Sequence, residues 1–96
     1  MQVANAAGRM LMPEFSQYHE PIIIEDAKYL GDVIRVRRKE LNMSLDEASL
    51  RLGVGRRLLL ELERGERDGA AFGTVMTILH RLGFDLMLQT RSTRKY

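Results

Sequence analysis

The residues best suited to specific chemistry in this chain are two adjacent arginines, Arg56 and Arg57, which follow the short turn Gly53-Val54-Gly55. A guanidinium group donates two parallel hydrogen bonds, and the O6 and N7 edge of guanine accepts such a pair in the major groove of duplex DNA. A glycine turn lets one helix end and the next begin within three residues, because glycine adopts the left-handed conformation at little cost. The pattern therefore predicts two short helices, of which the second presents both arginines to base edges.

Other reactive residue types lack the neighbours that catalysis or metal binding requires. The chain has no cysteine, and neither His19 nor His80 has a second histidine three or four residues away. Ser44 and Ser49 have no nearby base, and the acidic residues between 61 and 68 have no pocket in which a carboxylate pair could act. The glycine turn also lacks the lysine and hydroxyl residue of a phosphate-binding loop. The sequence predicts neither an enzyme nor a metal or cofactor site.

The chain is short, and its charges are unevenly distributed along the sequence. The 96 residues suffice for one domain with a net charge of +2. Residues 1–26 hold one basic side chain against four acidic ones, whereas residues 27–96 carry 14 basic side chains against 9 acidic ones. No apolar run approaches the ~20 residues that cross a bilayer, and the first residues lack the pattern of a secretory signal. We predict a cytoplasmic protein without a membrane segment. The basic side chains of residues 27–96 could bind an anionic partner, or they could simply form solvated surface.

The first two helices are marked by their ends. Asp26 is a predicted N-cap and Asn42 a predicted stop for a helix between them. Ser44 and Glu47 have the Ser-x-x-Glu spacing of a capping box, so a second helix begins there and ends at Gly53. The first helix shows a stripe at spacings of three and four, formed by Leu30, Val33, Ile34, Arg37 and Leu41.

Two further helices follow the glycine turn. The third, about residues 56–64, turns Leu59 and Leu62 inward and leaves Leu58 and Leu60 on its exposed face. The fourth ends at Gly83, and its apolar positions, all predicted to lie in the core, are Phe72, Val75, Met76, Ile78, Leu79 and Leu82.

The periodicity changes to two in residues 84–90, as in a half-buried strand. A single strand cannot satisfy its own backbone, and no other segment is a predicted partner. We therefore expect Phe84, Leu86 and Leu88 to mark a dimerisation strand that pairs with the same segment of a second copy. Residues 26–83 then form the DNA-binding domain. Residues 1–25 contain both prolines and are a predicted flexible or partner-binding arm, and residues 91–96 are a basic tail.

Between Leu30 and Leu82 the sequence resembles the Cro/repressor-type, or Xre, helix-turn-helix family. The resemblance implies a lambda-repressor-like all-α bundle of four or five helices that binds double-stranded DNA as a dimer. It also implies an ion pair between Arg38, late in the first helix, and Glu63, at the end of the recognition helix. The matching stretches are Leu30-Gly31-Asp32-Val33-Ile34-Arg35, Arg38-Lys39-Glu40-Leu41-Asn42-Met43-Ser44, Leu52-Gly53-Val54 and Leu62-Glu63-Arg64-Gly65.

The same resemblance implies roles at the DNA. It places Arg56, Arg57 and Glu61 at base edges, Leu60 against a thymine methyl group and Ser44 on a phosphate. Further phosphate contacts, which add affinity and salt dependence but little sequence choice, are expected from Lys39, Arg51, Arg64 and Arg67. The chain departs from the family pattern at Leu45, where a glutamine usually clamps the backbone, and at Leu58 and Leu60, where polar residues are usual.

The predicted strand indicates which members of the family the chain resembles most. A Cro-type domain followed at once by Leu82-Gly83-Phe84-Asp85-Leu86-Met87-Leu88 is similar to the HipB-like antitoxins, although the arm is longer than in that family. This similarity implies a homodimer that binds a palindromic operator and represses its own operon. It also implies that the dimer holds a HipA-like kinase toxin inactive. A plain autorepressor without a toxin is the other possibility within the DNA-binding class. The alternative is a dimeric protein-interaction adaptor that does not read DNA sequence. The salt dependence of binding would distinguish the two functions. The affinity for DNA falls steeply with salt concentration, whereas a leucine-dominated protein contact should be much less sensitive to salt.

Overall fold

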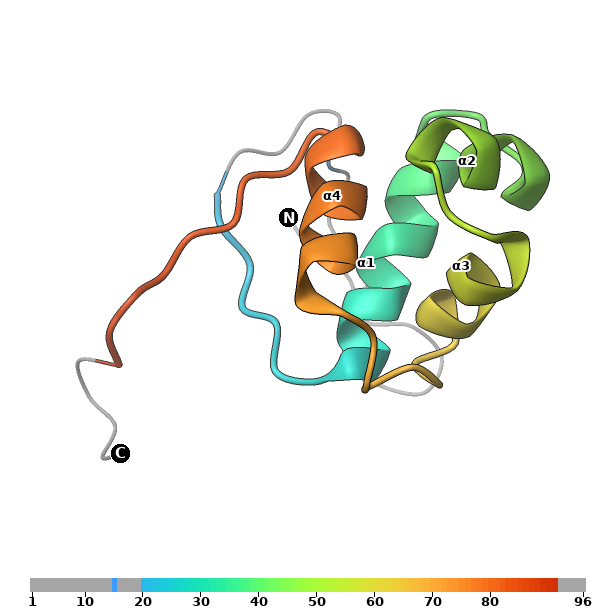
Figure 1. The fold of residues 1–96 in the computed structure, drawn as a ribbon. Helices are drawn as coiled ribbons and strands as arrows, with labels where there is room; N and C mark the ends of the chain where they lie inside the picture. The colour runs from blue at the N-terminus through green and yellow to red at the C-terminus, as the bar shows by residue number, and fades with distance from the viewer. Residues whose placement is uncertain (1–14, 16–19, 92–96) are drawn as a thin grey trace, which may run out of the picture.

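The computed structural model describes residues 15 and 20–91, and these residues form an all-α fold (Figure 1). Helix α3 packs along α1, and α2 packs against both α3 and α4. The predicted bundle of four or five helices therefore has four within the described residues, and none of them is long and apolar enough to span a membrane. The helices are α1 (Ala27–Glu40), α2 (Leu45–Leu52), α3 (Arg56–Glu63) and α4 (Phe72–Arg81).

The ends of α1 and α2 follow the predicted capping signals. The Asp26 carboxylate accepts from the Tyr29 N–H at 2.7 Å, which satisfies one of the free donors at the start of α1. Asn42, just beyond the end of α1, has a φ of 57°. Gly53 has a φ of 70° at the end of α2, so it supplies the left-handed turn that lets α3 begin at Arg56.

The core lies where the four helices meet. Ile34, Leu59 and Ile78, from α1, α3 and α4, have no exposed surface. Gly31 allows α1 to approach α3 closely, because a Cβ at this position would overlap the carbonyl oxygens of Leu62 and Glu63. The remaining members of the buried core are Val33, Met43, Ala48, Leu52, Leu62, Leu79 and Leu82.

Arg37 lies on the predicted apolar stripe of α1 for a reason that periodicity does not reveal. Its Nε donates to the carbonyl oxygen of Leu82 at 2.8 Å and satisfies a free acceptor at the end of α4. Glu40 then links Arg37 to the N-terminal side of the chain: it accepts from Arg37 Nη1 at 3.4 Å and from the Phe15 N–H at 2.8 Å. The Phe15 ring also stacks edge-on against Phe84, with 5.0 Å between ring centroids.

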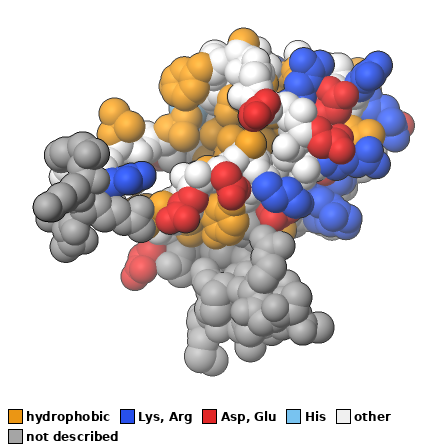
Figure 2. Space-filling view, turned by 90° about the horizontal axis from the view of Figure 1, so that it is seen from below, with side chains coloured by type: hydrophobic (Ala, Val, Ile, Leu, Met, Phe, Trp, Pro, Cys, Tyr) orange, Lys and Arg blue, Asp and Glu red, His pale blue; other side chains and the backbone are white. Residues whose placement is uncertain are grey.

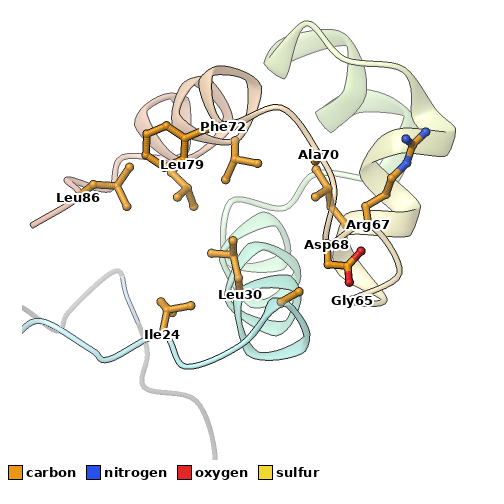
Figure 3. A pocket seen from close by; sticks show the side chains of 12 residues that line it. Ile24, Leu30, Gly65, Arg67, Asp68, Ala70, Phe72, Leu79 and Leu86 are labelled. Atoms are coloured by element: carbon orange, nitrogen blue, oxygen red, sulfur yellow. The ribbon is translucent and has the colours of Figure 1, made fainter. Parts of the chain in front are cut away.

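Two apolar side chains lie differently from the prediction. Phe72, predicted to be core, is 72% exposed at the start of α4, where it lines an apolar groove with Ile24, Leu30 and Leu86 (Figure 3). The helical period gives the face of α4 on which Phe72 lies, but among the described residues no element covers the first turn of that face. Leu58, predicted to be exposed, packs partly buried against the core.

The predicted strand 84–90 is not formed within the described residues. The segment leaves α4 and runs out from the body without helix or strand (Figure 1). The reason is that a strand needs a neighbour to satisfy its backbone, and the described part of the chain supplies none. Phe84 is half-buried against the core, whereas Leu86, Met87 and Leu88 are exposed. Of the predicted domains, residues 1–14 and 16–19 of the arm and 92–96 of the tail lie outside the described residues.

Candidate nucleic-acid interface

Helices α2 and α3 present the arginines that the glycine turn was expected to expose. Helix α3 begins at Arg56, with Gly55 as its N-cap residue, so Arg56 and Arg57 occupy its first turn. Their side chains are 60% and 89% exposed. The space-filling view shows basic side chains gathered on the side of the molecule that carries α2 and α3, with acidic side chains between them (Figure 2). The arrangement offers guanidinium groups to a large anionic partner rather than to an enclosed ligand.

Ser44 lies exposed at the start of α2 and forms the predicted capping box with Glu47. Its Oγ accepts from the Glu47 N–H at 3.1 Å, and its N–H donates to Glu47 Oε1 at 3.0 Å. The hydrogen bond from the Ser44 N–H, and then that from its hydroxyl, hold the pKa of the Glu47 carboxyl below its ordinary value of 4.5. Ser44 is exposed, so a phosphate oxygen can reach its hydroxyl, which would then exchange the Glu47 carboxylate for the phosphate as its acceptor.

Both candidate base-reading arginines are held by carboxylates. Arg56 Nε lies 2.6 Å from Oδ1 of Asp46, which is in the first turn of α2. Arg57 Nε lies 3.3 Å from Glu61 Oε2, and Arg67 Nε donates to the other oxygen of that carboxylate at 2.7 Å. The hydrogen bond from Arg67, and then that from Arg57, keep the pKa of Glu61 below its ordinary value. Glu61, predicted to contact a base, is thus already paired with two arginines in the free chain.

The remaining residues predicted to touch DNA differ in exposure. Lys39 lies in the last turn of α1, Arg51 in the last turn of α2, and Arg64 directly follows α3; all three are exposed. Arg67, in the loop between α3 and α4, reaches the interface through Glu61. Leu60 is half-buried, so only part of its side chain is available to a thymine methyl group.

A buried ion pair beneath the interface joins α1 to the end of α3. Arg38 donates from Nε and Nη2 to the two oxygens of Glu63, at 2.7 and 2.9 Å, and from Nη1 to the Met43 carbonyl at 2.9 Å. The Arg38 and Glu63 side chains are only 11% and 4% exposed. The hydrogen bond to Glu63 raises the pKa of Arg38 above its ordinary value. The ion pair fixes the end of α3 while the first turn of α3 stays exposed.

Sequence reasoning missed two residues in this region. Asp46 was not predicted to take part, because its contact with Arg56 depends on the angle at which the glycine turn sets α3 against α2. Leu50, on α2, is 84% exposed, and it was not assigned a role either. Among the described residues, no group of three or more His, Asp or Glu side chains is arranged to hold a metal ion.

Comparison with known proteins identifies the family. The sequence profile of a helix-turn-helix family (HTH_3) matches residues 34–87. The chain is 33% identical over 66 residues to an uncharacterised HTH-type transcriptional regulator, y4mF, of Sinorhizobium fredii (strain NBRC 101917 / NGR234); this covers 69% of the chain and 86% of y4mF. The fold is also similar to a chain in a crystal form of a HipB-O1-O2 complex, with a TM-score of 0.62 and 17% identity over 72% of this chain and 99% of that one. The chain is a non-enzymatic, DNA-binding transcriptional regulator of the Xre-type helix-turn-helix family.

Proposed function

We propose that the chain is a cytoplasmic, homodimeric autorepressor that reads a palindromic operator in the DNA upstream of its own gene. The observation that carries the proposal is the pair of exposed arginines in the first turn of α3, directly after the glycine turn. An arginine in this position can bond bidentately to guanine, and each such contact discriminates against a wrong base by about 1–3 kcal/mol. Arg56 and Arg57 therefore recognise guanines in the operator.

The other interface residues position the protein on the duplex. The Ser44 hydroxyl and the exposed Lys39, Arg51, Arg64 and Arg67 side chains contact phosphates, which adds affinity and salt dependence. Leu60 contacts a thymine methyl group with the part of its side chain that is exposed, and Glu61 lies beside it at the base edges.

The dimer is supported by an apolar surface that stays exposed among the described residues. Ile23, Phe72 and Met87 are each at least 70% exposed, and Leu88 is fully exposed. Leu86 lines the groove beside Phe72, on the side from which the segment 84–90 leaves the body (Figure 3). Pairing of this segment with its copy would satisfy both backbones and cover the apolar side chains. Two α3 helices would then enter successive major grooves, roughly 34 Å apart.

Within this function we propose the narrower role of antitoxin in a HipA/HipB-like operon, with a HipA-like kinase as partner. The support is the likeness in fold to HipB together with the apolar segment that follows the fourth helix. The product of an adjacent gene should then inhibit growth when expressed alone and should do so no longer when co-expressed with this chain. If no adjacent gene behaves in this way, the chain is a plain autorepressor.

Fluorescence anisotropy with upstream DNA tests the main proposal. Wild type should bind this duplex more tightly than a scrambled one, and the affinity should fall steeply between ~50 and ~200 mM salt as counterions are released. Arg57→Ala should abolish the preference, and Leu86→Lys should give a monomer that binds weakly. Weak binding to both duplexes, indifferent to Arg57 and to salt, would favour the protein-interaction adaptor instead; the exposed Leu50 would then mark the contact surface.

A further inference from the structure

The ion pair between Asp46 and Arg56 joins the first turn of α2 to the first turn of α3. Oδ1 and Nε are 2.6 Å apart, and the Arg56 and Asp46 side chains are 60% and 75% exposed. An exposed pair of this kind contributes little to folding stability, because water screens the charges. The pair does restrict a long arginine side chain that would otherwise sample many rotamers at the end of the helix.

The position of Asp46 beside the guanidinium determines which N–H donors of Arg56 remain available to a ligand. Nε is the guanidinium nitrogen nearest to the carboxylate, in an ion pair without hydrogen-bond geometry, and within the part of the chain that the structure describes no acceptor is hydrogen-bonded to Arg56. The donors on the Nη groups therefore remain for a ligand. Holding the group in one orientation lowers the entropy that is lost when it binds, and thus makes a bidentate contact more selective.

Resting on the proposed reading of DNA by α3, we propose that Asp46 is a specificity-determining positioning residue, which aims the paired donors of Arg56 at guanine. The neighbouring arginine has the same arrangement: Glu61 holds Arg57 at Nε, and Arg67 in turn holds Glu61. Both arginines proposed to read bases are thus oriented by a carboxylate of the protein. Asp46 differs from Glu61 in that it belongs to another helix and has no second ion pair in the described residues.

A carboxylate near DNA has two effects of opposite sign, and this makes the role testable. Asp46 repels phosphates, so its neutralisation should tighten binding to any duplex. If Asp46 also orients Arg56, its neutralisation should weaken the preference for the correct duplex. The quantity that separates these effects is the ratio of the dissociation constants for scrambled and upstream DNA, because general repulsion affects both constants equally.

The experiment compares this ratio in wild type, Asp46→Asn, Arg56→Ala and the double variant, with Asp32→Asn as control. Asp32→Asn removes the same charge and also breaks an ion pair, that with Lys28 on α1. Thermal melting first establishes that every variant is folded. We expect Asp46→Asn to lower the ratio about tenfold, within the range that one bidentate contact supplies. Asp32→Asn should leave the ratio unchanged, and Asp46→Asn should have no further effect once Arg56 is alanine.

Two results would overturn the inference while leaving the proposed function intact. Asp46→Asn could tighten binding to both duplexes by the same factor, which would make Asp46 a repulsive charge only. It could instead lower the ratio equally with and without Arg56, which would show that it acts through another group. A wild-type ratio near one would refute the proposed function itself, and the inference with it.

Discussion

Replacing Arg38 with alanine would test how the recognition helix is held against α1. The change removes two hydrogen bonds to Glu63 and one to the Met43 carbonyl. It also leaves the Glu63 carboxylate, only 4% exposed, without its counter-ion. Breaking a buried pair in this way costs about 3–5 kcal/mol. Because a domain of this size has a total stability of roughly 5–15 kcal/mol, the variant should lose about a third to a half of a mid-range free energy of unfolding.

Urea unfolding followed by far-UV circular dichroism measures this loss. The control, Lys28→Ala, breaks a pair with Asp32 in which the two side chains are 55% and 26% exposed, so it should cost no more than about 1 kcal/mol. The double variant Arg38→Met with Glu63→Leu should recover most of the stability, because no charge remains buried. An Arg38→Ala variant as stable as wild type would refute the reasoning, and equal losses in the single and double variants would assign the effect to packing rather than charge.

Two further predictions concern the scaffold. Gly31→Ala should lower stability by about 1–3 kcal/mol, because the new methyl group would overlap backbone oxygens of α3. Gly73→Ala is the control, because the position has open space around it. Equal melting temperatures of the two variants would contradict the close approach of α1 to α3. The pKa of Glu47 is lowered in the folded chain, so its contribution to stability is complete above its ordinary pKa of 4.5 and is lost as the pH falls through the lowered value. Glu47→Gln cannot titrate and should therefore flatten the acid limb of stability against pH, whereas an unchanged limb would exclude Glu47 as its cause.

The features that could be predicted from the sequence are local ones. Ser44 with Glu47, and Gly53 after Leu52, bring together the groups that start and end a helix within a few residues, so sequence spacing determines their contacts. The start of α3 at Arg56 follows from the same logic, because Gly53 ends α2 and the short turn lets the next helix begin.

The features that could not be predicted depend on how distant elements meet. Arg37 lies on an apolar stripe because it bonds to the Leu82 carbonyl, 45 residues later in the chain. Phe72 belongs to the apolar face of α4, but periodicity cannot tell whether another surface covers that face. The contact between Asp46 and Arg56 likewise depends on the angle between α2 and α3. Residues 84–90 show the same limit, because the formation of the predicted strand depends on a neighbouring strand that the described residues do not supply.

The most direct test of the central claim is a dimethyl sulfate footprint on the DNA upstream of this gene, because the reagent methylates guanine N7 in the major groove. Wild type should protect guanines in two clusters about one helical turn apart. Arg57→Ala, at a concentration that still occupies the duplex, should lose protection at one guanine in each cluster while its neighbours stay protected. Protection that is absent in wild type, or that is the same with and without Arg57, would contradict the claim that the first turn of α3 reads base edges.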